Sequence, residues 1–146
     1  MKVGSTSQLL LGLYSLLALG SLAACGGVAS PQASGTGADN ATLAADIAQG
    51  KSGAEVTFDA VVATEPHDSG GHERFSVTAP DGSRIEIDHN NSLAPEVPAH
   101  SGDHLLIRGQ LYIDPGPRIG VHCTHAHTSK GCPIAGFIQF AGTVYQ

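Results

Sequence analysis

Residues 55–62 read EVTFDAVV, and their apolar side chains recur at every second position. Successive side chains of a β-strand point to opposite faces of a sheet, so this period of two predicts a strand with one buried face. Further strand-like runs follow at 74–78, 84–87, 104–113 and 119–122, and a hairpin is predicted over 137–145. The sequence therefore predicts a mainly β protein.

The connections between these runs indicate how the strands are arranged. Residues 80–82 read Pro-Asp-Gly, and Asp-Gly is a strong hairpin signal. A long connector with two prolines covers residues 88–98, and Gly109 suggests a bulge or bend in the longest strand. Three strands in meander, a long connection and a strand pair are typical of a five-stranded Greek-key barrel of the OB type. We expect a small antiparallel OB-like barrel of five to six strands, with a generic β-barrel or sandwich as the alternative.

One short helix is expected before the first strand. Asn40 can cap it, residues 42–49 form it, and Gly50 suits its C-terminal end. Leu43 and Ile47 lie on one face of this helix, which is enough apolar surface for a lid or latch. Residues 40–146 are of single-domain length, so we expect one barrel domain with one modest core.

The first 24 residues have the features of a secretory signal. Lys2 precedes an apolar run over residues 9–22, and small residues lead into Cys25. The run is shorter than the ~20 residues that a membrane-spanning helix requires, so a retained anchor is the less favoured alternative. Residues 22–25, Leu-Ala-Ala-Cys, look like a bacterial lipobox, in which the cysteine receives a diacylglyceryl group and becomes the mature N-terminus. We predict a lipoprotein signal peptide over residues 1–24.

Lipidation of Cys25 would hold the domain on a membrane surface, because several acyl chains anchor a protein stably. A buried or disulfide-bonded Cys25 fits poorly, since glycines and a small, polar segment with proline follow it. Residues 25–39 are accordingly expected to form a flexible tether. Gly26 stands where proteins retained in the inner membrane commonly carry aspartate. We therefore expect a lipid-anchored protein of the cell envelope, in the outer membrane and facing the periplasm.

The charge balance is acidic, with 7 Lys and Arg against 13 Asp and Glu and a net charge of −6. An acidic domain repels phosphate backbones. The chain has no tryptophan and its basic residues are scattered singly, so it lacks a stacking platform for nucleic acid. Nucleic acid is a disfavoured partner; the expected partners are the membrane and either a small ligand or an envelope protein.

Cys123 and Cys132 lie in the segment HCTHAHTSKGC, residues 122–132. An oxidising periplasm would let the two cysteines pair, which stabilises by roughly 2 to 3 kcal/mol for so short a loop. The alternative is that two thiolates join His122 or His125 as metal ligands. We favour the disulfide, although the spacing permits the metal site.

Several separated motifs occur in a fixed order along the domain. They are GHERF at 71–75, IDHNNSLAP at 87–95, SGD at 101–103 before the strand with Gly109, GVHCTH at 120–125, and the final Tyr145-Gln146. Over residues 54–146 the chain resembles a bacterial family of small exported proteins, domain of unknown function 3465. Tryptophans of the family pattern are replaced here by Cys123 and Phe137, which suggests that a disulfide substitutes for aromatic packing. The resemblance implies no activity, because none is assigned to that family.

Five polar residues at predicted strand ends or loop edges are candidates for a site: His72, His89, Asn90, His122 and His125. Imidazole is the commonest neutral metal ligand and the usual general base near pH 7. We expect His122 and His125 to hold a metal ion, zinc or copper, which requires the chain to turn after His122. We expect His72, His89 and Asn90 to bind a small polar ligand. The alternative is that these residues brace the barrel rim, with Asn90 as a turn former.

Three functions stay open. The favoured one is a membrane-anchored binding module whose barrel holds a metal ion or small polar ligand at a histidine-rich rim. The second is a partner-binding or structural envelope protein, and the third is a histidine- or metal-assisted hydrolase. The sequence carries no Gly-x-Ser-x-Gly elbow, His-Glu-x-x-His helix, P-loop or dinucleotide fingerprint, so catalysis is the least supported.

Overall fold

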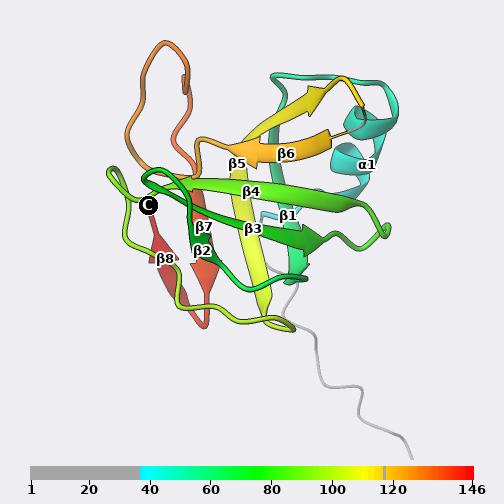
Figure 1. The fold of residues 1–146 in the computed structure, drawn as a ribbon. Coiled ribbons are helices and arrows are strands. Elements are labelled where there is room, and N and C mark those ends of the chain that lie inside the picture. Colours follow the sequence, from blue (N-terminus) through cyan, green and yellow to red (C-terminus); the bar gives the residue numbers. More distant parts are fainter. Residues whose placement is uncertain (1–36, 117) are drawn as a thin grey trace, which may run out of the picture. The chain divides into compact units, whose positions relative to one another are not determined.

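The computed structural model describes residues 37–116 and 118–146. This part of the chain forms one helix and eight strands: α1 (Asn40–Ala48), β1 (Glu55–Val62), β2 (His67–Asp68), β3 (His72–Thr78), β4 (Arg84–Asn90), β5 (His104–Asp114), β6 (Arg118–His122), β7 (Phe137–Phe140) and β8 (Thr143–Tyr145). The predicted mainly β fold with a short N-terminal helix is confirmed (Figure 1). The predicted signal peptide, the lipidated Cys25 and most of the tether lie outside the described residues. Within these residues, the helix is too short to cross a membrane.

Five strands close into a barrel. β1 pairs with β3, β3 with β4, β4 with β6 and β6 with β5, and β5 returns to β1. This ring is the predicted OB-like Greek key. It departs from the expected antiparallel barrel at one pair, because β4 and β6 run parallel. The cause is the long connector after β4, which carries the chain across to β1 before β6 fills the remaining gap between β4 and β5.

The core consists of the side chains that alternate along the barrel strands. On β1 the buried positions are Val56, Phe58, Ala60 and Val62, as the period of two predicted. They pack with inward residues of the other strands: Phe75, Val77, Ile85, Ile87, Leu105, Ile107, Leu111, Val121 and Ile138. Burying such side chains stabilises by roughly 1.5 to 3 kcal/mol each, which is why the alternation determines which face of each strand is inside.

Helix α1 packs against the barrel, as expected for a latch, but its N-terminal cap is not the predicted residue. Asp39, not Asn40, caps the helix, because its Oδ1 accepts from the backbone N–H of Thr42 at 3.0 Å. Asn40 instead joins the helix to β1: its Nδ2 donates to Asp59 Oδ2 at 3.1 Å and its Oδ1 accepts from the Asp59 N–H at 2.9 Å. Leu43 lies in the core with an exposure of 1%.

β5 changes partner at Gly109. Residues 105–108 pair with β7, and residues 110–114 pair with β6. Pairing with β1 runs through Gly109 without an extra residue, so the predicted bulge does not form. The glycine is required by a close approach, since a Cβ there would lie 2.4 Å from the carbonyl oxygen of His122. β2 was not expected from the sequence; it pairs with the start of β3.

Candidate metal site

The parallel pairing of β4 with β6 gathers the histidine motifs at one end of the barrel. Ile87 lies opposite Val121, so His89 and His122 come shortly afterwards at the same ends of neighbouring strands. β3 runs antiparallel to β4 and begins at His72, opposite Asn90. The beginning of β3, the ends of β4 and β6, and the loop after β6 therefore meet here.

The chain turns immediately after His122, as a shared site with His125 requires. Cys123 has a φ of +56°, in the left-handed region that L-residues seldom adopt. Its side chain forms a disulfide with Cys132, which confirms the predicted pairing. Gly136 closes the loop: its N–H donates to the carbonyl of His125 at 2.9 Å, and a Cβ there would lie 2.0 Å from the carbonyl oxygen of Cys123.

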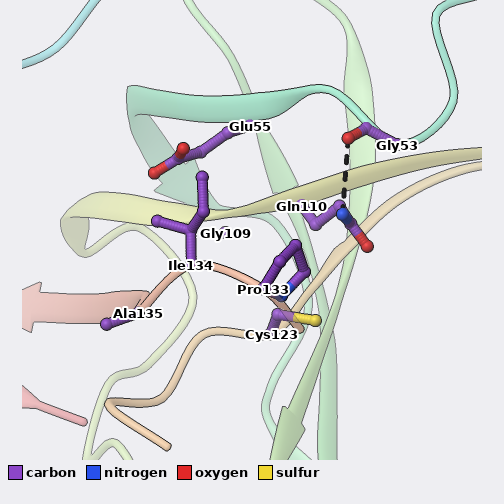
Figure 2. A pocket seen from close by; sticks show the side chains of 8 residues that line it. All are labelled: Gly53, Glu55, Gly109, Gln110, Cys123, Pro133, Ile134 and Ala135. Atoms are coloured by element: carbon purple, nitrogen blue, oxygen red, sulfur yellow. Dashed lines mark hydrogen bonds between the residues drawn. The ribbon is translucent and has the colours of Figure 1, made fainter. Parts of the chain in front are cut away.

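His122 is held with one ring nitrogen aimed at the disulfide. Gln110 donates from Nε2 to the carbonyl of Gly53 at 3.3 Å (Figure 2). Its Oε1 is therefore the atom that faces His122. His122 Nε2 donates to that Oε1 at 3.1 Å, which leaves Nδ1 unprotonated in the neutral ring. Nδ1 lies 3.6 Å from Cys123 Sγ. A hydrogen-bond acceptor behind a histidine is what orients the ring in most metal sites.

The same half-buried ring stays neutral at physiological pH. Burial lowers the pKa of His122, and the nearby carboxylate of Asp88 opposes this shift only in part. Metal binding requires the neutral imidazole, so a lowered pKa favours the ligand form. Sequence reasoning missed Gln110, although a polar residue facing outward on the strand beside His122 was the signal that the register would have revealed.

His125 lies against the other sulfur. Its Nε2 is 3.9 Å from Cys132 Sγ, and its Nδ1 has no hydrogen-bond partner among the described residues. The residue is buried, with an exposure of 4%, and burial lowers its pKa. A buried ring without a strong partner for either nitrogen is rare in proteins and points to a ligand or water that completes it.

The ligand atoms of His122, Cys123 and Cys132 all lie within 4.8 Å of one another. Imidazole nitrogen and thiolate sulfur are the donors that zinc and copper prefer, so the residue types fit either metal. His122 and His125 do not form a pair by themselves; each contacts a different sulfur of the disulfide. As long as Cys123 and Cys132 form the disulfide, their sulfurs carry no thiolate charge. In this oxidised state only the imidazoles of His122 and His125 can bind a metal ion.

His89 has no free ring nitrogen for a ligand. It is fully buried; its Nε2 donates to the carbonyl of Pro95 at 3.0 Å, and its Nδ1 accepts from Thr124 Oγ1 at 2.7 Å. Burial is the main cause that lowers its pKa, so the ring is neutral. The side chain joins β4, the connector and the loop after β6, and in this arrangement it braces the barrel.

The two other candidates for the small-ligand site also have local roles or contacts. Asn90 Oδ1 accepts from the N–H of Ser92 at 2.9 Å, which is the turn that an asparagine at this place commonly forms. His72 is half-buried, and its Nδ1 lies 3.4 Å from the carbonyl of Gly70. The geometry thus supports the predicted pair His122 and His125 as metal ligands more than the predicted ligand site at His72, His89 and Asn90.

Glu73 has a structural role that its sequence position conceals. Glu73 is buried; its Oε2 accepts from the N–H of Val97 at 3.0 Å and its N–H donates to Asn91 Oδ1 at 3.1 Å. Burial raises the pKa of its carboxyl. Through these two hydrogen bonds, Glu73 links the connector between β4 and β5 to β3.

A small pocket of about 150 Å³ opens beside the disulfide (Figure 2). Its walls are Gly53, Glu55, Gly109, Gln110, Cys123, Pro133, Ile134 and Ala135. Ile134 is 44% exposed and Cys132 is partly exposed, whereas Cys123 is buried. Solvent thus approaches the site from the side of the loop.

Neither a known family model nor a curated protein matches this chain. The resemblance to domain of unknown function 3465 accordingly rests on the sequence motifs alone.

Proposed function

We propose that this protein is a lipid-anchored envelope module whose barrel binds one transition-metal ion, zinc or copper, at the end formed by β4, β6 and the loop after β6. The observation that carries this proposal is the group of three ligand atoms from His122, Cys123 and Cys132 within 4.8 Å. The orientation of His122 by Gln110 supports it, because the ring is set for a ligand before any ion arrives.

Binding is favoured over catalysis by the number of protein donors. A catalytic zinc keeps an open position for water, whereas a site that the protein fills with four ligands is closed. Here His125 Nε2, 3.9 Å from Cys132 Sγ, would join the group of three as a fourth donor once the two cysteines are reduced to thiolates. A closed site holds or transfers an ion, which suits a module for metal binding at the envelope.

The anchoring part of the proposal concerns residues before the barrel. Residues 1–24 act as the signal peptide, Cys25 carries the lipid, and residues 25–39 are the tether that lets the barrel face the periplasm from the outer membrane. The test is Cys25→Ser, which we expect to move the protein from the membrane fraction to the soluble fraction. Membrane association that survives the substitution would contradict lipidation.

Metal binding is tested by equilibrium dialysis against zinc, followed by elemental analysis of the full chain. Cys25→Ser serves as the background, because it removes the only other thiol. Oxidised and reduced samples are compared with His122→Ala and with His104→Ala, an exposed histidine of β5. We expect close to one zinc per chain in at least one redox state, lost in His122→Ala and kept in His104→Ala. The same dialysis is run against copper, and an absence of both metals in both redox states would refute the proposal.

A further inference from the structure

We infer that the Cys123–Cys132 disulfide is a redox switch: a dithiol reductant opens it, and the two thiolates then hold one zinc or cuprous ion together with His122 and His125. The inference rests on the proposed function and adds to it the redox state in which the site forms. It starts from the position of an imidazole beside each sulfur, at 3.6 Å and 3.9 Å.

These separations match a tetrahedral metal site. With Zn–S bonds of about 2.3 Å and Zn–N bonds of about 2.0 to 2.1 Å, tetrahedral angles place nitrogen and sulfur ligands about 3.6 Å apart. His122 Nδ1 stands at 3.6 Å from Cys123 Sγ and His125 Nε2 at 3.9 Å from Cys132 Sγ. Each imidazole is therefore at ligand distance from one sulfur already. Opening the disulfide must separate the two sulfurs to about 3.8 Å on the same geometry and bring His125, which lies outside the group of ligand atoms within 4.8 Å, to the same ion.

The loop allows this separation because its two cysteines are held differently. Cys123 is buried at the end of β6, next to the buried Thr124. Cys132 is partly exposed in a segment whose other residues, 126–131 and 133–135, are all exposed. Its N–H donates to Ser129 Oγ at 3.1 Å and its carbonyl accepts from the Ser129 N–H at 2.8 Å. The turn from Ser129 to Cys132 can thus move as one piece away from a fixed Cys123.

The chemistry balances in two steps. First, the dithiol transfers two electrons and two protons to the disulfide, so that its own sulfurs form a disulfide and Cys123 and Cys132 become thiols. Second, the zinc or cuprous ion binds both sulfurs as thiolates, and the two thiol protons are released to solvent. Before reduction the sulfurs have neither charge nor ionisable proton, so the ion would have two neutral imidazoles alone. Reduction therefore turns a weak two-nitrogen site into a site with two anionic sulfurs.

His125 is the residue that the switch explains best. In the oxidised form its buried ring has a sulfur at 3.9 Å beside Nε2, and within the part of the chain that the structure describes Nδ1 has no hydrogen-bond partner. A buried polar ring of this kind lacks the interactions that repay its removal from water. A bond from Nε2 to the ion gives the buried ring one strong interaction, at the nitrogen that now has only a sulfur at 3.9 Å.

The test is a titration with cobalt(II) and zinc, without oxygen, of the Cys25→Ser chain in its oxidised and reduced forms. We expect the reduced protein to bind zinc about 100-fold more tightly or better, with thiolate-to-cobalt charge-transfer absorption and release of the ion on reoxidation. His125→Gln should weaken zinc binding by about 10-fold or more, whereas His127→Gln, an exposed neighbour, should bind as the parent does.

The outcomes separate this inference from the proposed function. Equal affinity in both redox states, or a cobalt spectrum without thiolate bands, would overturn the switch while leaving metal binding intact. An absence of binding in both states would refute the proposed function itself. The far-ultraviolet circular dichroism of the reduced protein should keep its β signature. Its loss with binding retained would mean that unfolded thiols capture the ion, which would also overturn the inference.

Discussion

Acidification should lower the free energy of unfolding through His89, a buried imidazole that is neutral in the folded protein. Burial lowers its pKa in the folded protein, against the opposing effect of the hydrogen bond to Pro95. In the unfolded chain the same ring titrates near its ordinary value of about 6.5. Between these two values the unfolded chain binds more protons than the folded one, so the free energy of unfolding falls as the pH falls. His89 makes its full contribution to the free energy of unfolding above about pH 6.5, and this contribution decreases as the pH falls toward the folded-state pKa.

The expected change in the free energy of unfolding follows from one titrating proton on His89 and the two hydrogen bonds of its ring. A difference of one bound proton changes the free energy of unfolding by up to about 1.4 kcal/mol per pH unit. At neutral pH, removing a partner from a buried hydrogen bond costs about 1 to 3 kcal/mol. His89→Asn can keep an acceptor for Thr124 Oγ1 and loses the donor to Pro95, whereas His89→Gln can keep that donor and loses the acceptor. Each variant should therefore lose about 1 to 3 kcal/mol at neutral pH, and neither titrates.

The assay is urea unfolding of the oxidised protein at several pH values between about 5.5 and 7.5, which bracket the ordinary histidine pKa. The stability difference between parent and variant should shrink as the pH falls, by up to about 1.4 kcal/mol per unit, because only the parent loses the contribution of His89. His104→Gln, at an exposed position of β5, is the matched control for replacing a histidine. A constant difference for His89→Asn and His89→Gln would refute the assignment of a buried neutral imidazole.

Three further predictions concern the loop and its support. Replacing Cys123 and Cys132 together by serine should lower the free energy of unfolding by roughly 2 to 3 kcal/mol in urea, since their sequence separation of 9 closes a short loop; unchanged stability would contradict the chain-entropy argument. Gly136→Ala should lower the melting temperature and prevent metal binding, because the new Cβ would lie 2.0 Å from a carbonyl oxygen. Gly131→Ala is the control and should behave as the parent, because its nearest atom is 3.9 Å away. Equal melting curves for the two variants would show that the loop can shift to make room for the Cβ. Gln110→Leu should weaken zinc binding by about 10- to 100-fold with little change in stability, as measured by competition with a chelating dye; full affinity would remove the orienting role of this amide.

The strands were predictable because their signal is local. Every alternating run that predicted a strand, from residues 55–62 to the final hairpin, is a strand in the structure. β2 was missed because its two residues have no pattern of their own and are a strand only through pairing with β3. The helix cap moved from Asn40 to Asp39 for a related reason: Asn40 has a better partner in Asp59, which is distant in sequence.

The candidate site was predictable only in part. The loop disulfide followed from residue types and close spacing within residues 122–132, and so did the place of His122 beside it, whereas His125 lies outside the group of ligand atoms within 4.8 Å. The role of His89 did not, because its ring partners belong to residues 95 and 124, which the connector and the loop after β6 bring to it. Gln110 was missed for the same reason, since it meets His122 only through the pairing of β5 with β6.

By itself, the sequence determined the β class, the barrel strands, the latch helix and the cysteine pair, because alternation, turn residues and short loop closure act between neighbours along the chain. Only the tertiary structure decided which histidines could serve a ligand. That depends on the parallel pairing of β4 with β6, which sets two distant motifs side by side and buries one imidazole among protein partners while leaving two others against the sulfurs. Burial and hydrogen-bond partners are properties of packing between distant segments, so residue type alone did not distinguish His89 from His122 and His125.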